Sequence, residues 1–466
     1  MEKFAHLKLV IRKTGLAALL GGGKEPPETK KNKADRQGHS GKLQQWVADI
    51  KSNWERDFSE REENELAPLD KDIVTVFFQI NPSLLLPTFD LEAFGIEIIS
   101  EEEDGYIIGA SADNFRTLEE KIAGFIQKDH ATAKIADLWQ IIDGNRKEWR
   151  AKHILSEELF AKWVKIRDDD RFKLEVSIAF AKPLGTRPDP TKRGGEQRLQ
   201  KYLKHQEQRD DALMDRQNHF ENFISFYGTF LSSLVELGDS FGTQVEISGK
   251  GLKDLVENYP FVFEVVEIDE ASVEETDGQE TEGDELEILP PTEGAPIVGV
   301  IDSGIMEGHK YLNAAIDHGR SVSYLDHDTS TADHVRGGGH GTKVAGAIIF
   351  PSGVSSVRGQ YALPCYIRNL RVLDENNSLQ DRYPAYLMQR IVDGNEDCKL
   401  YNLSVASKTP FRLKHMSSWA AVIDKLTQRY IIHFISWKYS VSLCKSIFRE
   451  GYKLSALFRQ PILSHS

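Results

Sequence analysis

A run of acidic residues divides this chain of 466 residues. Residues 269–293 contain eleven Asp and Glu and neither Lys nor Arg. Like charges at this density repel one another, and the run offers few apolar side chains to a core. We therefore expect a flexible acidic linker over residues 269–295, with an N-terminal region before it and a separate domain after it.

The rest of the chain is almost neutral. The acidic run carries −11 of the formal net charge of −14, which leaves −3 for all other residues. An acidic total argues against a nucleic-acid partner, because binding to phosphates needs a surplus of Lys and Arg on one surface. The concentration of the charge in the linker weakens that argument. The five Lys and Arg of residues 21–41 are the best local case for an anionic partner, but a solvated arm explains the same composition, and we expect no nucleic acid as a partner.

The cysteines and the hydropathy pattern exclude several classes of protein. Cys365, Cys398 and Cys444 form no Cys-x-x-Cys pair, which disfavours a disulfide framework and a zinc site. No window approaches the ~20 apolar residues that a membrane helix needs, and the first residues lack the apolar core of a secretory signal. Residues 326–340 are rich in Asp and His but have no recognised ligand spacing, so a surface loop is favoured over a metal site. We predict a cytoplasmic protein with no membrane, metal or cofactor.

The N-terminal region has the pattern of an α+β fold. Residues 1–42 include a Gly-, Pro- and Lys-rich stretch without periodicity, which favours a flexible arm. Residues 43–268 alternate between helical and strand patterns. The expected elements are a helix at 43–58, a strand at 72–80, a hairpin turning at 104–105, a helix at 113–127, two helical stretches within 135–165, a strand at 173–181, a long helix at 196–237 and a strand–helix–strand unit at 243–268.

Two motifs follow the acidic run. The segment PIVGVIDSGI, residues 296–305, is typical of a buried parallel strand that ends in Asp302, and open α/β sheets place their ligands at that end of a strand. Thirty-eight residues later, His340 opens the segment HGTKVAGAI, whose small residues allow a helix to pack closely on a sheet. A strand-end acid and a helix-start histidine are a candidate acid–base pair.

VIDSGI and HGTKVAGAI together resemble the Asp and His motifs of the subtilisin-like serine peptidases, the subtilases. Their catalytic triad runs Asp, His, Ser along the chain, an order for which subtilisin itself is the reference case. The resemblance implies an α/β fold, a subtilisin-like parallel sheet with flanking helices, over residues 296–436, and cleavage of polypeptide substrates. It also implies that Asp302 orients the imidazole and that His340 acts as general base and then general acid.

A third segment, KLYNLSVAS at residues 399–407, resembles the subtilase strand that pairs with the substrate backbone. By that resemblance Ser404, Val405 and Ala406 bind the substrate. The family usually has glycine where this chain has Ala406, and the added methyl group would narrow the specificity pocket. A buried core strand is the alternative interpretation of the same pattern.

The resemblance ends after residue 436. The printed chain has neither the Ala-Gly-Asn run that supplies the oxyanion-hole amide nor the Gly-Thr-Ser run that supplies the nucleophile. Residues 437–466 lose the family pattern and hold five Lys and Arg against one Glu. We expect a truncated catalytic domain with a non-family tail, such as a frameshift would produce, and no peptidase activity as the chain stands.

The layout implies a more specific relationship. It resembles bacterial cytoplasmic subtilases that are encoded beside an AAA-type ATPase, a pair associated with phage defence, and this implies an ATPase partner. Residues 43–268 are then either a propeptide-like inhibitory module or a regulatory docking module. A degraded, non-catalytic copy that acts as a binding module is the alternative to an enzyme.

Overall fold

A computed structural model describes most of the chain. Its described residues form two compact units, one within Val10–Ile268 and Arg412–Ala421 and the other within Asp269–Phe411 and Val422–Ser466. The described ranges are 25–80, 91–102, 106–129, 132–141, 146–180, 184–185, 187–268, 271–272, 286–335, 339–351, 353–354, 357–379, 383–407, 416–430 and 432–435.

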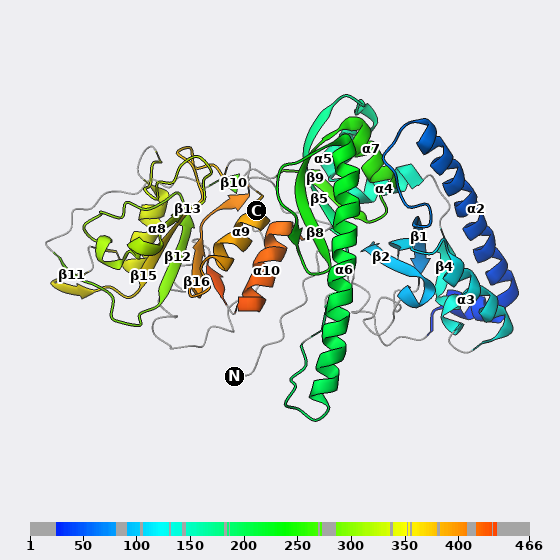
Figure 1. Ribbon diagram of the computed structural model, residues 1–466, viewed down its shortest axis with the longest axis horizontal. Helices are drawn as coiled ribbons and strands as arrows, with labels where there is room; N and C mark the ends of the chain where they lie inside the picture. The colour runs from blue at the N-terminus through cyan, green and yellow to red at the C-terminus, as the bar shows by residue number, and fades with distance from the viewer. Residues whose placement is uncertain are drawn as a thin grey trace. The chain divides into compact units, whose positions relative to one another are not determined.

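The first part of the N-terminal unit is an antiparallel sheet in the order β2-β3-β1-β4. Successive residues of a strand face opposite sides, and Val74, Val76 and Phe78 of β1 face a core that α2 and α3 close. Figure 1 shows these helices beside the sheet. The elements are α1 (Pro27–Ala34), α2 (Arg36–Glu63), β1 (Val74–Ile80), η3 (Leu91–Phe94), β2 (Ile96–Glu101), β3 (Tyr106–Ser111), α3 (Arg116–Gln127), η5 (Ala133–Asp137) and β4 (Leu138–Ile141).

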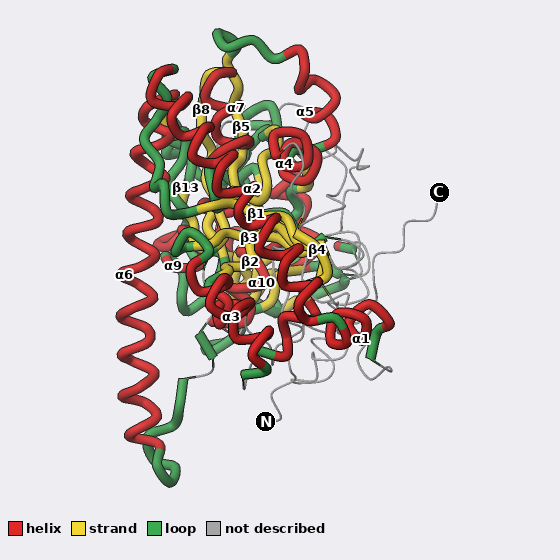
Figure 2. Tube along the Cα trace, turned by 90° about the vertical axis from the view of Figure 1, so that its right-hand side faces the viewer, coloured by secondary structure: helices red, strands yellow, loops and turns green. Residues whose placement is uncertain are grey.

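The second part is another antiparallel sheet, in the order β6-β8-β5-β9, with β7 also paired to β8. Buried aromatic residues near the end of α6 and apolar residues of α7 supply its core. The first turns of α6, a helix of 33 residues, extend well beyond this sheet (Figure 2). The elements are α4 (Arg146–Ile154), α5 (Glu157–Lys162), η6 (Trp163–Lys165), β5 (Arg171–Ala179), α6 (Gly195–Tyr227), β6 (Gly228–Phe230), β7 (Val235–Glu236), β8 (Ser240–Ser248), α7 (Gly249–Asn258) and β9 (Val262–Glu267).

A buried ion pair joins the two parts of the N-terminal unit. Arg61 of α2 donates through both terminal nitrogens to Asp254 of α7, each at 2.6 Å. Only 5% of the Arg61 side chain and 2% of the Asp254 side chain are exposed. The Tyr227 hydroxyl also donates to Asp254, and burial together with this carboxylate raises the pKa of Tyr227. The two parts are therefore fixed to each other by a desolvated polar network.

The C-terminal unit is built on a parallel sheet in the order β13-β15-β12-β16-β18. Helix α8 covers one face, where Val298, Val300 and Ile367 meet Val344 and Ile348. The elements are β12 (Ile297–Asp302), η7 (Asn313–Ala315), η8 (His318–Arg320), β13 (Val322–Ser323), α8 (His340–Ile349), β14 (Gln360–Ala362), β15 (Tyr366–Arg371), α9 (Pro384–Asp393), β16 (Leu400–Leu403), α10 (Ser418–Tyr430) and β18 (His433–Ile435). The predicted α/β fold, a parallel sheet with flanking helices, is confirmed.

The predicted flexible arm over residues 1–42 is wrong from Pro27 onward, because α1 and the start of α2 occupy that stretch. Its polar side chains are buried and bonded rather than solvated. Thr29 donates to Asp137 at 2.8 Å, and Asn32 donates to the carbonyl of Ala136 at 3.0 Å. Residues 1–24 of the predicted arm lie outside the described residues.

The long helix expected to reach residue 237 ends instead at Tyr227. The chain from Gly228 onward pairs with β8, first as β6 and then as β7, and these backbone bonds replace the helical ones. Part of the stretch predicted as helical within 135–165 is also a strand, β4, which completes the first sheet.

The acidic linker is not free of structure at either end. Ala271–Ser272 form β10, which pairs antiparallel with Ala406–Ser407, β17. Glu287–Leu289 form β11, which pairs in parallel with β14. The unstructured linker expected over 269–295 is therefore wrong at these two places. Residues 273–285 and the predicted tail at 437–466 lie outside the described residues.

Candidate active site

Asp302 is the last residue of β12, at the carboxyl end of the central strand of the sheet. Its side chain is fully buried. The carboxylate accepts a hydrogen bond of 2.7 Å from the backbone N–H of Ser303, and the carbonyl of Asp302 accepts one of 2.8 Å from Val372. Asp302 therefore lies at the carboxyl end of an apolar strand, as the sequence predicts, and these hydrogen bonds hold it there.

His340 is the first residue of α8, and its ring meets that acid. Nδ1 lies 2.9 Å from both carboxylate oxygens of Asp302, and 12% of the imidazole side chain is exposed. An ionised carboxylate only accepts hydrogen bonds, so in a contact with one Nδ1 is the donor, and Nε2 is the ring nitrogen left to act as a base. The two residues predicted as an acid–base pair are brought together in the geometry of a general base with its orienting acid.

The approach of α8 to β12 depends on Gly341. A Cβ at this position would overlap the carbonyl oxygen of Gly304 and lie 3.1 Å from the Cβ of Asp302. Gly304 itself has φ +103°, a backbone conformation that L side chains rarely adopt. The glycines of the two motifs therefore allow the close contact between the strand end and the helix start.

A second layer of polar side chains surrounds the pair, and the sequence did not reveal it. Ser303 accepts a hydrogen bond of 3.0 Å from the Gly341 N–H and donates one of 3.1 Å to Asp333. Asp333 also accepts from the N–H and the hydroxyl of Thr342, at 3.2 and 3.0 Å. The Asp- and His-rich segment 326–340 thus contributes a carboxylate to the site, which its lack of recognised spacing concealed.

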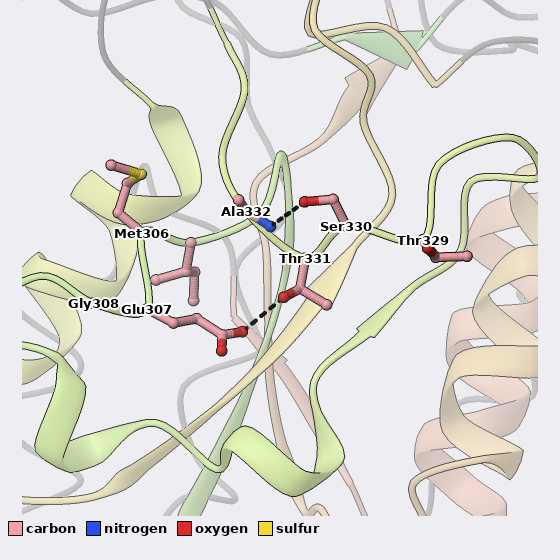
Figure 3. Close-up of a pocket in the computed structure, with 8 residues that line it drawn as sticks. Met306, Glu307, Gly308, Thr329, Ser330, Thr331 and Ala332 are labelled. Atoms are coloured by element: carbon pink, nitrogen blue, oxygen red, sulfur yellow. Dashed lines mark hydrogen bonds between the residues drawn. The ribbon is translucent and has the colours of Figure 1, made fainter.

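A shallow cavity of about 490 Å³ lies between the loops that follow Asp302 and precede Asp333 (Figure 3). Its lining residues are Ile305, Met306, Glu307, Gly308, Thr329, Ser330, Thr331 and Ala332. Glu307 accepts hydrogen bonds from Asn369 at 2.8 Å and from Thr331 at 3.0 Å. Burial raises the pKa of Glu307, but these and neighbouring hydrogen bonds outweigh burial and hold the pKa below its usual value. The carboxylate is therefore ionised at neutral pH and holds the two loops together.

Residues 294–436 match the subtilase family. This subtilase segment contains Asp302, His340 and the whole parallel sheet. Among solved structures, the chain is similar to an epidermin leader peptide processing serine protease from Staphylococcus aureus, with 12% identity and a TM-score of 0.32. That match covers 59% of this chain and 64% of the other, so this chain spans less than two thirds of that protein. No curated protein matches the chain.

The subtilase segment places Ser404 and Val405 at the same sheet edge as Asp302. Leu403 of β16 pairs with Ile301 of β12, so the chain leaves the sheet there beside the end of β12. The hydroxyl of Ser404 accepts a hydrogen bond of 2.7 Å from the side chain of Asn402. Ala406 begins β17, whose backbone is paired with β10 of the linker. The predicted substrate strand therefore has a neighbouring strand from the same chain.

In the described part of the chain, no three His, Cys, Asp or Glu side chains lie together as metal ligands would. Within the same ranges, no helix combines the length and the hydropathy needed to cross a membrane.

Proposed function

We propose that the subtilase segment carries the acid and the base of a serine endopeptidase site that acts on polypeptides. The observation that carries this proposal is the contact of His340 Nδ1 with both carboxylate oxygens of buried Asp302. In that arrangement Asp302 holds the imidazole in one tautomer and stabilises its cation, and Nε2 of His340 removes a proton from a hydroxyl nucleophile. Ser404, Val405 and Ala406 would hold the substrate backbone beside them.

We further propose that the printed chain does not hydrolyse peptide bonds by itself. None of its serines lies in a Gly-Thr-Ser run, and no Ala-Gly-Asn run occurs. Without a nucleophile, the base has no group to activate. Without an oxyanion hole, no hydrogen-bond donors stabilise the negative charge that develops in the transition state.

Reactivity toward a fluorophosphonate probe tests both parts of this proposal. We expect no labelling of the 466-residue chain, and no cleavage of casein above background. Proton NMR should nevertheless show a far-downfield resonance from the His340 Nδ1–H, and Asp302→Asn should remove it. Labelling that is lost in His340→Ala would show that a nucleophile is present after all. A downfield spectrum unchanged by Asp302→Asn would contradict the acid–base pair.

The pairing of β10 with β17 favours a second role, as a regulated or purely binding module. The acidic segment lies along the strand predicted to bind substrate, in the antiparallel manner in which an added peptide extends a sheet. This pairing supports an inhibitory role like that of a propeptide, in which the linker is an intramolecular competitor of substrate.

Proline substitutions in β10 test that competition. The double variant Ala271→Pro/Ser272→Pro removes the backbone N–H groups that a strand donates. We expect it to bind a fluorescein-labelled peptide of the sequence of residues 269–280 about tenfold more tightly than the parent chain, because a tethered competitor acts at a high effective concentration. Fluorescence anisotropy measures the affinity, with Ala271→Ser/Ser272→Ala as the control. Equal affinities in all three proteins would exclude β10 as a competitor.

We also propose, from the layout of the chain, a bacterial cytoplasmic setting with an AAA-type ATPase partner in phage defence. The proposal rests on the motifs and the acidic linker alone. Co-expression with an ATPase encoded beside this chain should give a complex that co-purifies, and separate elution of the two proteins would count against it.

A further inference from the structure

We propose that Asp333 is a positioning residue for His340. The inference rests on the proposed function, because the placement of His340 matters to catalysis only if its imidazole acts as the base. Asp333 does not belong to the Asp302–His340 pair. It lies in the loop before α8, and 9% of its surface is exposed.

Asp333 caps the helix that carries His340. The N–H groups of the first turn of a helix have no partner within the helix. Here the Thr342 N–H and hydroxyl both donate to Oδ2 of Asp333, at 3.2 and 3.0 Å. The usual capping position is occupied by Gly339, which has no side chain to serve. A Cβ at Gly339 would overlap the Asp333 carboxylate, so the glycine leaves room for a cap from elsewhere in the chain.

The same carboxylate also reaches the strand that carries the acid. Oδ1 of Asp333 accepts a hydrogen bond of 3.1 Å from Ser303, the residue after Asp302, and Ser303 in turn accepts from the Gly341 N–H at 3.0 Å. Asp333 therefore connects the start of α8 to the end of β12 through bonds that do not involve the imidazole. If the first turn of α8 rotated or moved away from β12, the bonds of Asp333 and Ser303 to that turn would break. The bond from His340 to Asp302 would break with them.

The loop that bears Asp333 is itself fastened to the sheet. Arg371, which pairs with Asp302 in the register of β15 and β12, donates to Asp328 at 2.6 Å and to the carbonyl of Ser330 at 2.8 Å. Asn369 of the same strand donates to the carbonyl of Thr331 at 2.8 Å. The loop is thus bonded to the strand next to β12 as far as Thr331, two residues before Asp333.

The charge of Asp333 adds an electrostatic role. The amino end of a helix carries a partial positive charge, which opposes a cation at its first residue. His340 must become such a cation when it accepts a proton from a nucleophile. A buried carboxylate beside the first turn offsets the helix dipole, and the Asp302 carboxylate contacts the imidazole itself. Loss of the Asp333 charge should therefore change the electrostatic field at the ring.

The far-downfield resonance of the His340 Nδ1–H tests this inference without any need for peptidase activity. We expect Asp333→Ala to broaden that resonance beyond detection and to speed hydrogen exchange of the Gly341 and Thr342 amides at least tenfold. Asp333→Asn keeps a capping oxygen but removes the charge, so it should retain the resonance at a shifted frequency. Asp393→Asn removes the same charge at the end of α9, where the carboxylate accepts from the exposed Tyr430 hydroxyl at 2.6 Å, so it should leave the resonance and both amides unchanged.

The outcomes separate this inference from the proposed function. If Asp302→Asn removes the resonance and both Asp333 variants leave it unchanged, the acid–base pair stands and the role of Asp333 is overturned. If Asp302→Asn leaves the resonance unchanged, the proposed acid–base pair is contradicted, and the role of Asp333, which depends on that pair, is overturned with it. A purely structural Asp333 would lower the urea midpoint while the frequency of the resonance in Asp333→Asn stayed the same, and that result also overturns the inference. If Asp333→Ala does not fold, Asp333→Asn alone decides.

Discussion

Asp254→Leu is expected to lower the free energy of unfolding of the N-terminal unit by about 3–5 kcal/mol, because it leaves a charge buried without its partner. The Arg61 guanidinium would keep only its bond to the carbonyl of Ala67 at 2.6 Å. Tyr227 and Asn258 would also lose their acceptor. Urea unfolding followed by circular dichroism measures the change.

Two controls make this expectation specific. Arg61→Met/Asp254→Leu removes both charges, and it should be less destabilising than Asp254→Leu alone, since no unpaired ion remains. Glu119→Gln breaks an ion pair of Glu119 with Lys51 at 2.8 Å, in which the Glu119 side chain is 44% exposed. It should cost less than about 1 kcal/mol. If Asp254→Leu also lowered the free energy of unfolding by less than about 1 kcal/mol, the buried ion pair would not be what holds the two parts of the unit together.

Gly341→Ala is expected to separate His340 from Asp302 and to destabilise the subtilase segment by about 1–3 kcal/mol through overpacking. The new Cβ would overlap the carbonyl oxygen of Gly304. Because this oxygen belongs to the backbone, it cannot avoid the overlap by a change of side-chain rotamer. The first turn of α8 must then move away from β12. Loss of the His340 Nδ1–H resonance and a lower urea midpoint are the two measurements.

Gly346→Ala provides the matched control for this prediction. Gly346 lies five residues later in the same helix, and a Cβ there would meet nothing within 4 Å. Alanine should therefore stabilise the protein by about 0.4–1 kcal/mol, because it restricts the unfolded chain. Opposite signs for one substitution at two sites of one helix are the expected result. Equal effects would show that contact with Gly304 does not limit the site.

The acid–base pair could be predicted from the sequence because its determinants are local. A run of apolar residues that ends in Asp302 defines a strand and its edge, and the glycines around His340 define a close helix start. Strand β16 lies in the segment at residues 399–407 that resembles the subtilase substrate strand. These features need no knowledge of distant contacts.

Asp333 and the arm could not be predicted in the same way. Asp333 functions through Thr342 and Ser303, which a loop without periodicity does not indicate. Thr29 and Asn32 have the composition of a solvated arm, and only their tertiary partners Asp137 and Ala136 make them buried. Polar composition alone does not distinguish a hydrated side chain from a buried one with a hydrogen bond. The helix boundary at Tyr227 was missed because strand pairing with β8 overrides local propensity.

The strands at the two ends of the linker also determine where its charge acts. β10 and β11 both belong to the C-terminal unit, so the seven carboxylates of residues 273–285 are tethered at both ends to the unit that holds Asp302 and His340. Like charges at this density repel one another, so closing the chain between β10 and β11 carries an electrostatic cost, which salt screens over a Debye length of about 10 Å at 0.1 M.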